Sequence, residues 1–303
     1  MQRKAWFEFH DHRLFPGFLR DLVTDALQAM WNAQQIYSPI APRLERVIAD
    51  SRARCIVDLC SGSGGPWLRF ASELTSDGGS SPQVLLTDKY PSRGRIRRIE
   101  TETGNRVSFY PDPVDAREIP AELTGFRTIF STFHHFGPRE ARAILKSSFE
   151  QHQGIGIFEA AKCDPRTLAA VIVVPLLALR LAPLIQPFRW SRIFWTYCLP
   201  VIPLTLWLDG MLSCLRSYSQ ADLRELISGL ESDSYRWEIG EERGGPVPIT
   251  YLLGWPSTSS DTGDIRSENT AIDSLQIKRS AWQVPGGPGE NAPDVIAEAA
   301  IPR

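Results

Sequence analysis

The sequence predicts an α/β protein with a mostly parallel seven-stranded sheet and helices on both faces. Five short apolar runs recur between residues 54 and 159, and helical patterns separate several of them. Strands that alternate with helices are typical of βαβ units, in which the strands are parallel. A glycine-rich turn directly follows the first run, where an open α/β sheet binds its ligand. Two further strand-like runs are joined by Gly244-Gly245-Pro246 and are expected to close the sheet.

The expected elements follow from local apolar patterns in chain order. Apolar runs that end at turns predict strands over residues 55–59, 84–88, 107–110, 126–132, 154–159, 235–241 and 247–255. Apolar residues at helical spacing predict an N-terminal helical region over 18–50 and a helix over 139–149. A capping box that begins at Ser219 opens another helix, which Gly229 is expected to end.

The chain is expected to divide into segments of different character. Residues 1–50 are expected to form a helical lid, and residues 51–256 a ligand-binding α/β domain. An apolar insertion over 165–218 interrupts this domain, and its residues 169–208 carry three charges, all of them arginine. Residues 257–303 combine Ser, Thr, Gly, Pro and acids with little apolar periodicity, so we expect a mostly disordered tail.

The composition argues against several classes of protein. The 303 residues contain 33 Lys plus Arg and 35 Asp plus Glu, for a net charge of −2. This balance disfavours a nucleic-acid partner, which usually requires a basic face. The five cysteines form no C-x-x-C pair, which indicates a reducing compartment and no zinc site. The N-terminus lacks the unbroken apolar core of a signal peptide, so a cytoplasmic location is expected.

The most informative segment is Val57-Asp58-Leu59-Cys60-Ser61-Gly62-Ser63-Gly64-Gly65, directly after the first predicted strand. A glycine turn before a helix lets a ligand approach bare backbone amides. The dinucleotide pattern G-x-G-x-x-G does not fit, because Trp67 lies three residues after Gly64. The segment resembles motif I of the class I S-adenosylmethionine (SAM) dependent methyltransferases, acid-x-Gly-x-Gly-x-Gly, with Cys60 in place of the first glycine.

The resemblance implies a Rossmann-like sheet with SAM as the cofactor. It implies that Asp88, at the end of the second strand, accepts the ribose hydroxyls, and that Asp115 and Ala116 contact the adenine. Two simpler interpretations stay open, in which Asp58 only caps the turn and Asp115 only caps a helix. The expected cofactor-binding residues are Tyr37, Asp58, Cys60, Gly62, Ser63, Gly64, Asp88, Lys89, Asp115, Ala116 and Phe133.

Two residues are candidates for catalysis. His134 follows the fourth strand, which that family places beside the transferred methyl group, and is expected to act as a base. His135 is assigned a packing role, because neighbours at a strand end point to different sides. Asp209 ends the apolar run. It is either an acid that acts in the active site or a turn residue in contact with Arg216. The expected substrate-binding residues are Phe7, Trp195 and Tyr218.

The expected function is methyl transfer from SAM to a small aromatic or lipophilic molecule, as in natural-product tailoring, without a metal ion. We interpret the apolar insertion as a helical cap over the site, because prolines and Arg180 interrupt its runs. The alternative is a membrane-associated protein in which 169–208 dips into one leaflet. A nicotinamide oxidoreductase is disfavoured by Trp67 and by the lack of a Tyr-x-x-x-Lys pair.

Overall fold

The computed structural model describes residues 15–71, 74, 82–91, 99–101, 103–104 and 106–257. The substrate contact expected at Phe7 lies outside the described residues, and so does the expected tail beyond Ser257.

The described residues form a seven-stranded sheet in the order β3-β2-β1-β4-β5-β7-β6. The first five strands are parallel, whereas β7 runs antiparallel to both β5 and β6. The strands are β1 Cys55–Asp58, β2 Gln83–Leu86, β3 Val107–Phe109, β4 Phe126–Phe130, β5 Ile155–Glu159, β6 Tyr235–Glu242 and β7 Ile249–Pro256. The predicted Rossmann-like sheet is therefore confirmed, including the hairpin that closes it.

The helices agree with the predicted patterns in kind and order. They are α1 Gly17–Gln34, α2 Ala41–Ser51, α3 Trp67–Phe70, α5 Pro138–Glu150, α6 Pro165–Leu181, α7 Trp190–Ile193, α8 Val201–Arg216 and α9 Gln220–Ile227. Shorter turns are η2 Ser38–Ile40, the 3₁₀ turn η3 Phe133–His135 and the π-helical turn η4 Phe194–Cys198. The strand expected over 126–132 ends at Phe130, and η3 begins three residues later.

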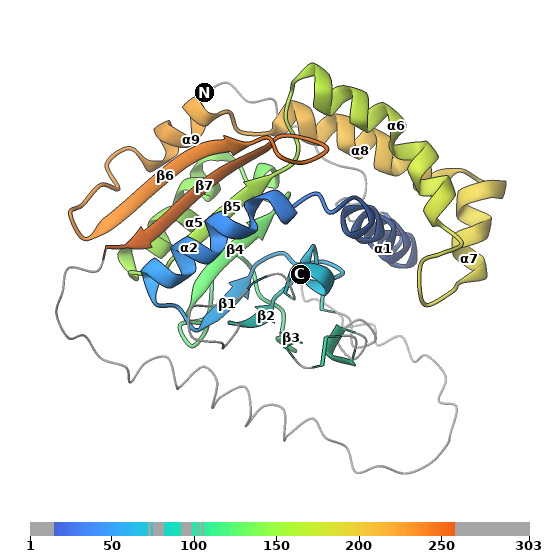
Figure 1. Ribbon diagram of the computed structural model, residues 1–303. Helices are drawn as coiled ribbons and strands as arrows, with labels where there is room; N and C mark the ends of the chain where they lie inside the picture. The colour runs from blue at the N-terminus through green and yellow to red at the C-terminus, as the bar shows by residue number, and fades with distance from the viewer. Residues whose placement is uncertain are drawn as a thin grey trace, which may run out of the picture.

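Each face of the sheet is covered by helices (Figure 1). Leu44 and Val47 of α2 pack with Ile56 and other strand residues in one apolar cluster. Ile144 of α5 and Leu223 of α9 pack on the opposite face in a second cluster. Neighbouring strand residues such as Ile56 and Val57 enter different clusters, because successive side chains of a strand alternate between faces.

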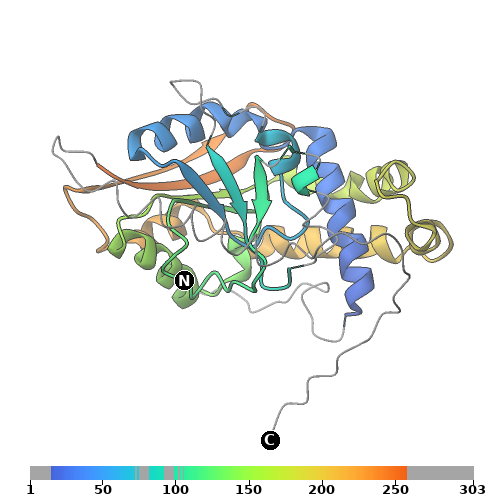
Figure 2. The ribbon, with the colours of Figure 1, turned by 90° about the horizontal axis from the view of Figure 1, so that it is seen from below.

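The predicted insertion forms helices that pack on α1 rather than on the sheet. Figures 1 and 2 show α1, α6, α7 and α8 gathered at one end of the sheet. Leu22 and Ala26 of α1 share a third apolar cluster with Ala178 of α6 and Leu206 of α8.

Within the described part of the chain, no single helix is long and apolar enough to cross a membrane. Trp190–Cys198 and Val201–Arg216 meet the length and composition requirement only as a pair, bent by 71°.

Candidate active site

A cavity of about 1020 Å³ lies where the carboxyl ends of the parallel strands meet α1, α6 and α8. The strand ends supply polar lining residues such as Asp58, Asp88 and His134, whereas the helices supply mainly apolar side chains. Open α/β sheets bind ligands at this edge, where the strand order reverses between β1 and β4. Because ligand pockets commonly measure about 300–1,000 Å³, this cavity has room for a nucleoside and a second small molecule.

The glycine-rich turn after β1 is held in conformations that favour glycine. Gly62 and Gly64 have φ angles of 54° and 103°, and Cys60 adopts a left-handed φ of 58° despite its side chain. A Cβ atom on Gly64 would lie 2.9 Å from Ile99 Cδ1, so this glycine cannot carry a side chain without displacing its neighbour. Cys60, Gly62 and Ser63 line the cavity, whereas Gly64 is covered by Ile99 and Gln28.

Asp58 lines the cavity, and its side chain also supports the glycine-rich turn after β1. Its side chain is buried and accepts hydrogen bonds from Ser61 Oγ at 2.6 Å and Thr128 Oγ1 at 2.7 Å. Burial raises the pKa of Asp58 to about 6, although the hydroxyl donors oppose this shift. The structure therefore gives Asp58 the turn-supporting contacts of the simpler interpretation and also a place in the cavity wall.

The raised pKa predicts a specific dependence of stability on pH. Since the folded pKa lies above the ordinary 3.8, Asp58 contributes stability that is full below pH 3.8 and lost as pH rises through 6. A difference of about two pKa units corresponds to about 3 kcal/mol. Urea unfolding of the parent and of Asp58→Asn should therefore show the parent losing about 2–3 kcal/mol relative to the variant between pH 4 and 7. A difference that stays constant over this range would contradict the assignment.

The predicted ribose acid, Asp88, lies beside the turn. Its Oδ2 accepts the Gly62 N–H at 2.8 Å and its Oδ1 accepts the Tyr90 N–H at 2.8 Å. An ionised carboxylate offers about four acceptor positions, so both oxygens keep capacity for ligand hydroxyls. Asp88 and Lys89 both line the cavity, as expected for cofactor contacts.

Asp115 and Ala116 line the same part of the cavity. Asp115 contacts Arg117 Nη2 at 2.6 Å and Lys89 Nζ at 3.1 Å. Hydrogen bonds from Arg117, together with Lys89, hold the pKa of Asp115 well below its ordinary value. Arg117 also lines the cavity, although it was not among the predicted site residues.

His134 is buried at the cavity wall and is paired with a carboxylate. Its Nδ1 lies 2.6 Å from Glu159 Oε2, and its backbone N–H donates to Glu159 Oε1 at 3.3 Å. Glu159 ends β5, next to β4 in the sheet, and is itself buried. With Nδ1 directed at Glu159, Nε2 is the ring nitrogen through which His134 could act on a molecule in the cavity.

The packing role expected for His135 is wrong, because His135 also lines the cavity. The prediction assumed that the two residues alternate across a strand, but both belong to the 3₁₀ turn η3. Their rings are 4.4 Å apart between centroids. Arg216, a possible partner of Asp209, donates from Nη2 to the backbone carbonyl of His135 at 3.0 Å.

Asp209 lines the cavity from α8 and its side chain is buried. The two substrate-contact candidates that the structure describes, Tyr218 and Trp195, do not line the cavity. Tyr218 is buried in the core, where its hydroxyl donates to the Phe136 carbonyl at 2.8 Å. Trp195 packs on Phe18 and Phe194 in the cap. Neither is among the described residues that line the cavity, which corrects both predictions.

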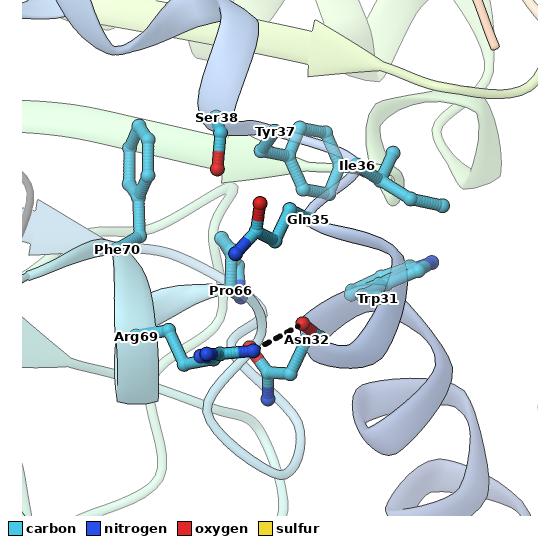
Figure 3. Close-up of a pocket in the computed structure, with 9 residues that line it drawn as sticks. All are labelled: Trp31, Asn32, Gln35, Ile36, Tyr37, Ser38, Pro66, Arg69 and Phe70. Atoms are coloured by element: carbon cyan, nitrogen blue, oxygen red, sulfur yellow. Dashed lines mark hydrogen bonds between the residues drawn. The ribbon is translucent and has the colours of Figure 1, made fainter. Parts of the chain in front are cut away.

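Tyr37 and Phe133 lie behind the cavity wall rather than in it. The Tyr37 hydroxyl is 2.5 Å from Ser131 Oγ, and its ring packs edge-on against Phe130. Figure 3 shows Tyr37 among the residues that line a small adjacent pocket, together with the hydrogen bond from Arg69 to the Asn32 carbonyl. The volume of this pocket is about 10 Å³. Phe133 is fully buried, so the cofactor contacts expected for Tyr37, Phe133 and the covered Gly64 are not formed by the cavity lining.

Sequence reasoning missed a polar cluster that joins α1 to the turn and the cap. Asp25 of α1 accepts from Ser63 Oγ at 3.1 Å and from Arg192 Nη2 at 3.3 Å. Arg192 of α7 is fully buried, and Gln28 donates to the Ser63 carbonyl. The available signal was the position of Asp25, three residues after Leu22 on the apolar side of the helix.

No cluster suited to a metal ion is present in the part of the chain that the structure describes. There, no three His, Cys, Asp or Glu side chains come together in a way that could hold a metal ion.

No protein-family model matches the sequence, and no curated protein matches it significantly. Solved structures with a similar fold include an O-methyltransferase family protein from Burkholderia thailandensis, at 17% identity and a TM-score of 0.44 over 78% of this chain and 60% of that one. Human N-acetylserotonin methyltransferase in complex with SAM matches at 13% identity and a TM-score of 0.45, over 79% and 56%. An O-methyltransferase family 2 protein from Planctomyces limnophilus, in complex with apigenin, matches at 13% and 0.46, over 84% and 63%.

The chain thus spans 56–63% of the length of these three structures.

Proposed function

We propose that the chain transfers a methyl group from SAM to a hydroxyl oxygen of a small lipophilic molecule. The observation that carries this proposal is a single cavity that is lined both by the glycine turn with Asp88 and by His134, which Glu159 pairs from behind the wall. The first group suits a nucleoside, and the second suits the removal of a proton. Their common cavity brings a cofactor and an acceptor within reach of each other.

The residues of the turn fit the cofactor that the resemblance implies. Gly62 presents no side chain to the cavity, and Asp88 lies within hydrogen-bonding distance of its backbone N–H. Asp88 would hold the ribose hydroxyls, and Asp115 and Ala116 would lie beside the base. When bound, SAM supplies a methyl group on a positively charged sulfonium, which is an electrophile for an in-line displacement.

His134 would accept the proton of the acceptor hydroxyl as the oxygen becomes a nucleophile. Glu159 would fix the imidazole through Nδ1 and stabilise the imidazolium that forms, as the acid of a hydrolase triad does for its histidine. Asp209, which also lines the cavity, would accept a hydrogen bond from a second polar group of the acceptor. The roles of His134 and Glu159 call for an acceptor group that loses a proton during the reaction. We choose a hydroxyl because it is the acceptor group for which a neutral histidine is best suited as the base.

The acceptor is proposed to be lipophilic because the helical side of the cavity is apolar. Aliphatic side chains from α1, α6 and α8 supply this wall, namely Val23, Leu27, Met30, Val171, Val174, Leu177 and Leu206. Apolar walls with few polar anchors are typical of small-molecule sites and fix orientation through those anchors. Here the anchors would be His134 and Asp209.

Calorimetric titration with S-adenosylhomocysteine (SAH) tests the cofactor assignment. The intact protein should bind SAH at one site, and Asp88→Ala should weaken this binding about 10- to 100-fold through the loss of charge-assisted hydrogen bonds. Asp50→Ala is the matched control, because it removes the same charge from an exposed position on α2. Equal affinity in Asp88→Ala, or binding of NAD in place of SAH, would refute the assignment.

A further inference from the structure

The outer side of the cap is unusually apolar. We define the cap face as the outward sides of α6 and α8 with the connecting segment 182–200. Apart from Phe18 and Tyr90, every exposed large apolar side chain of the described residues lies in this region, between Ile172 and Leu215. Trp190 is 77% exposed, and Ile172, Leu176 and Leu184 are each about two-thirds exposed. Soluble monomers rarely expose apolar side chains in such concentration, so the cap face indicates a contact site.

Helical periodicity places these side chains on one side of the two helices. In α6, the exposed residues Ile172, Val173 and Leu176 are spaced as neighbours on one stripe, whereas Ala178 faces α1. In α8, Leu204, Leu208 and Leu215 form a similar outward stripe. Since α6 and α8 pack side by side on α1, both stripes face away from it.

The charge of the cap identifies the kind of partner. Residues 165–216 contain five arginines and one acid, and that acid, Asp209, is buried at the cavity. Arg180 and Arg189 are exposed beside the apolar side chains, and Arg189 also lies 4.0 Å from the buried Asp25. Apolar side chains and aromatic residues flanked only by positive charge suit the interface of an anionic bilayer. A second copy of the chain would instead bring like-charged arginines together on both sides of a symmetric contact.

The cap face is continuous with the cavity. Val173 is 54% exposed on the cap face and also lines the cavity, so the apolar wall reaches the surface there. We propose that the cap face docks on the surface of an anionic lipid bilayer and that the cavity takes its acceptor from the lipid. The second part rests on the proposed function, whereas the docking does not.

Sedimentation of the full chain with lipid vesicles tests the docking. Vesicles that contain phosphatidylglycerol in addition to phosphatidylcholine should bind more protein than phosphatidylcholine alone, with part of the binding lost at high salt. Leu176→Glu should lower the ratio of vesicle-bound to free protein at least about tenfold. It removes apolar area that docking would bury, and it adds a negative charge that the anionic lipid repels. Leu184→Glu makes the same change on the connecting segment and tests the cap face at a second position.

The control is Ala121→Glu, which adds the same charge at an exposed position in the loop before β4, at the opposite end of the strands. It should bind vesicles as the parent does, and all variants should keep the parent's melting temperature. SAH titration of the same proteins separates the docking proposal from the proposed function. A protein that binds vesicles but not SAH would refute the proposed function and leave the docking proposal standing. A parent that binds neither vesicle type would overturn the docking proposal. So would a dimer, measured by light scattering, that Leu176→Glu converts to a monomer.

Discussion

Replacing His134 with Ala should lower the turnover number about 100- to 10,000-fold, the usual contribution of a positioned acid or base. The ring is buried at the cavity wall, and its Nδ1 lies 2.6 Å from Glu159 Oε2, the carboxylate that would stabilise the protonated ring. The affinity for SAH should be unchanged, because the proposed function assigns the cofactor to the glycine turn and Asp88, which line another part of the cavity. The measurement is the release of SAH from SAM with an acceptor found by screening lipophilic hydroxyl compounds.

Three comparisons separate catalysis from structural damage. Imidazole added to His134→Ala should restore part of the turnover, since the emptied space opens to the cavity. Glu159→Gln should also lower turnover, because the amide keeps the shape but not the charge that stabilises the imidazolium. His135→Ala should cost much less, although His135 lines the same cavity. Full activity in His134→Ala, or a larger loss in His135→Ala, would refute the role assigned to His134.

Arg192→Met should lower the free energy of unfolding by about 3–5 kcal/mol, the usual result of removing one partner from a buried ion pair. The guanidinium is fully buried, donates to the Ile185 carbonyl at 2.7 Å and lies 3.3 Å from Asp25. Without it, the buried Asp25 carboxylate would keep only the Ser63 hydroxyl at 3.1 Å and the more distant Arg189 guanidinium at 4.0 Å. Urea denaturation at pH 7 measures the loss.

Arg180→Met is the matched control, because Arg180 lies on the same cap but is exposed. Its cost should stay within about 0.5 kcal/mol. The double variant Asp25→Asn with Arg192→Met should be more stable than Arg192→Met alone, since it removes the buried carboxylate charge that Arg192 no longer neutralises. Equal costs for Arg192→Met and Arg180→Met would show that the pair does not stabilise the fold.

The same pair connects the cap to the cofactor side of the cavity. Asp25 accepts from Ser63 of the glycine turn through one oxygen and from Arg192 of α7 through the other. The cap, α1 and the turn therefore share one buried carboxylate. Arg192→Met is expected to weaken SAH binding as well as stability, because the turn loses part of its support.

The strand ends could be predicted from the sequence because the signals are local. Apolar runs that end in Asp58, Asp88 or His134 place these residues at one sheet edge once the strands are parallel, and all three line the cavity. The pairing of His134 with Glu159 required the strand order as well. Phe130 and Phe158 are paired in the register of β4 and β5, so the residues that follow them lie side by side.

The side-chain contacts of the cap could not be predicted from the sequence in the same way. Asp25 and Arg192 are 167 residues apart, and their contact depends on the path of the chain through α6 and α7. Trp195 and Tyr218 are residue types that often contact substrates, but residue type does not say whether a side chain packs on its neighbours or faces the cavity. His135 was misplaced because a strand was assumed where the chain forms a 3₁₀ turn.

A crystal structure of the protein with SAH tests the central claim most directly. We predict SAH in the 1020 Å³ cavity, with its ribose hydroxyls within hydrogen-bonding distance of Asp88 and its sulfur facing the side of the cavity that holds His134. SAH bound outside this cavity, or with its ribose away from Asp88, would contradict the account.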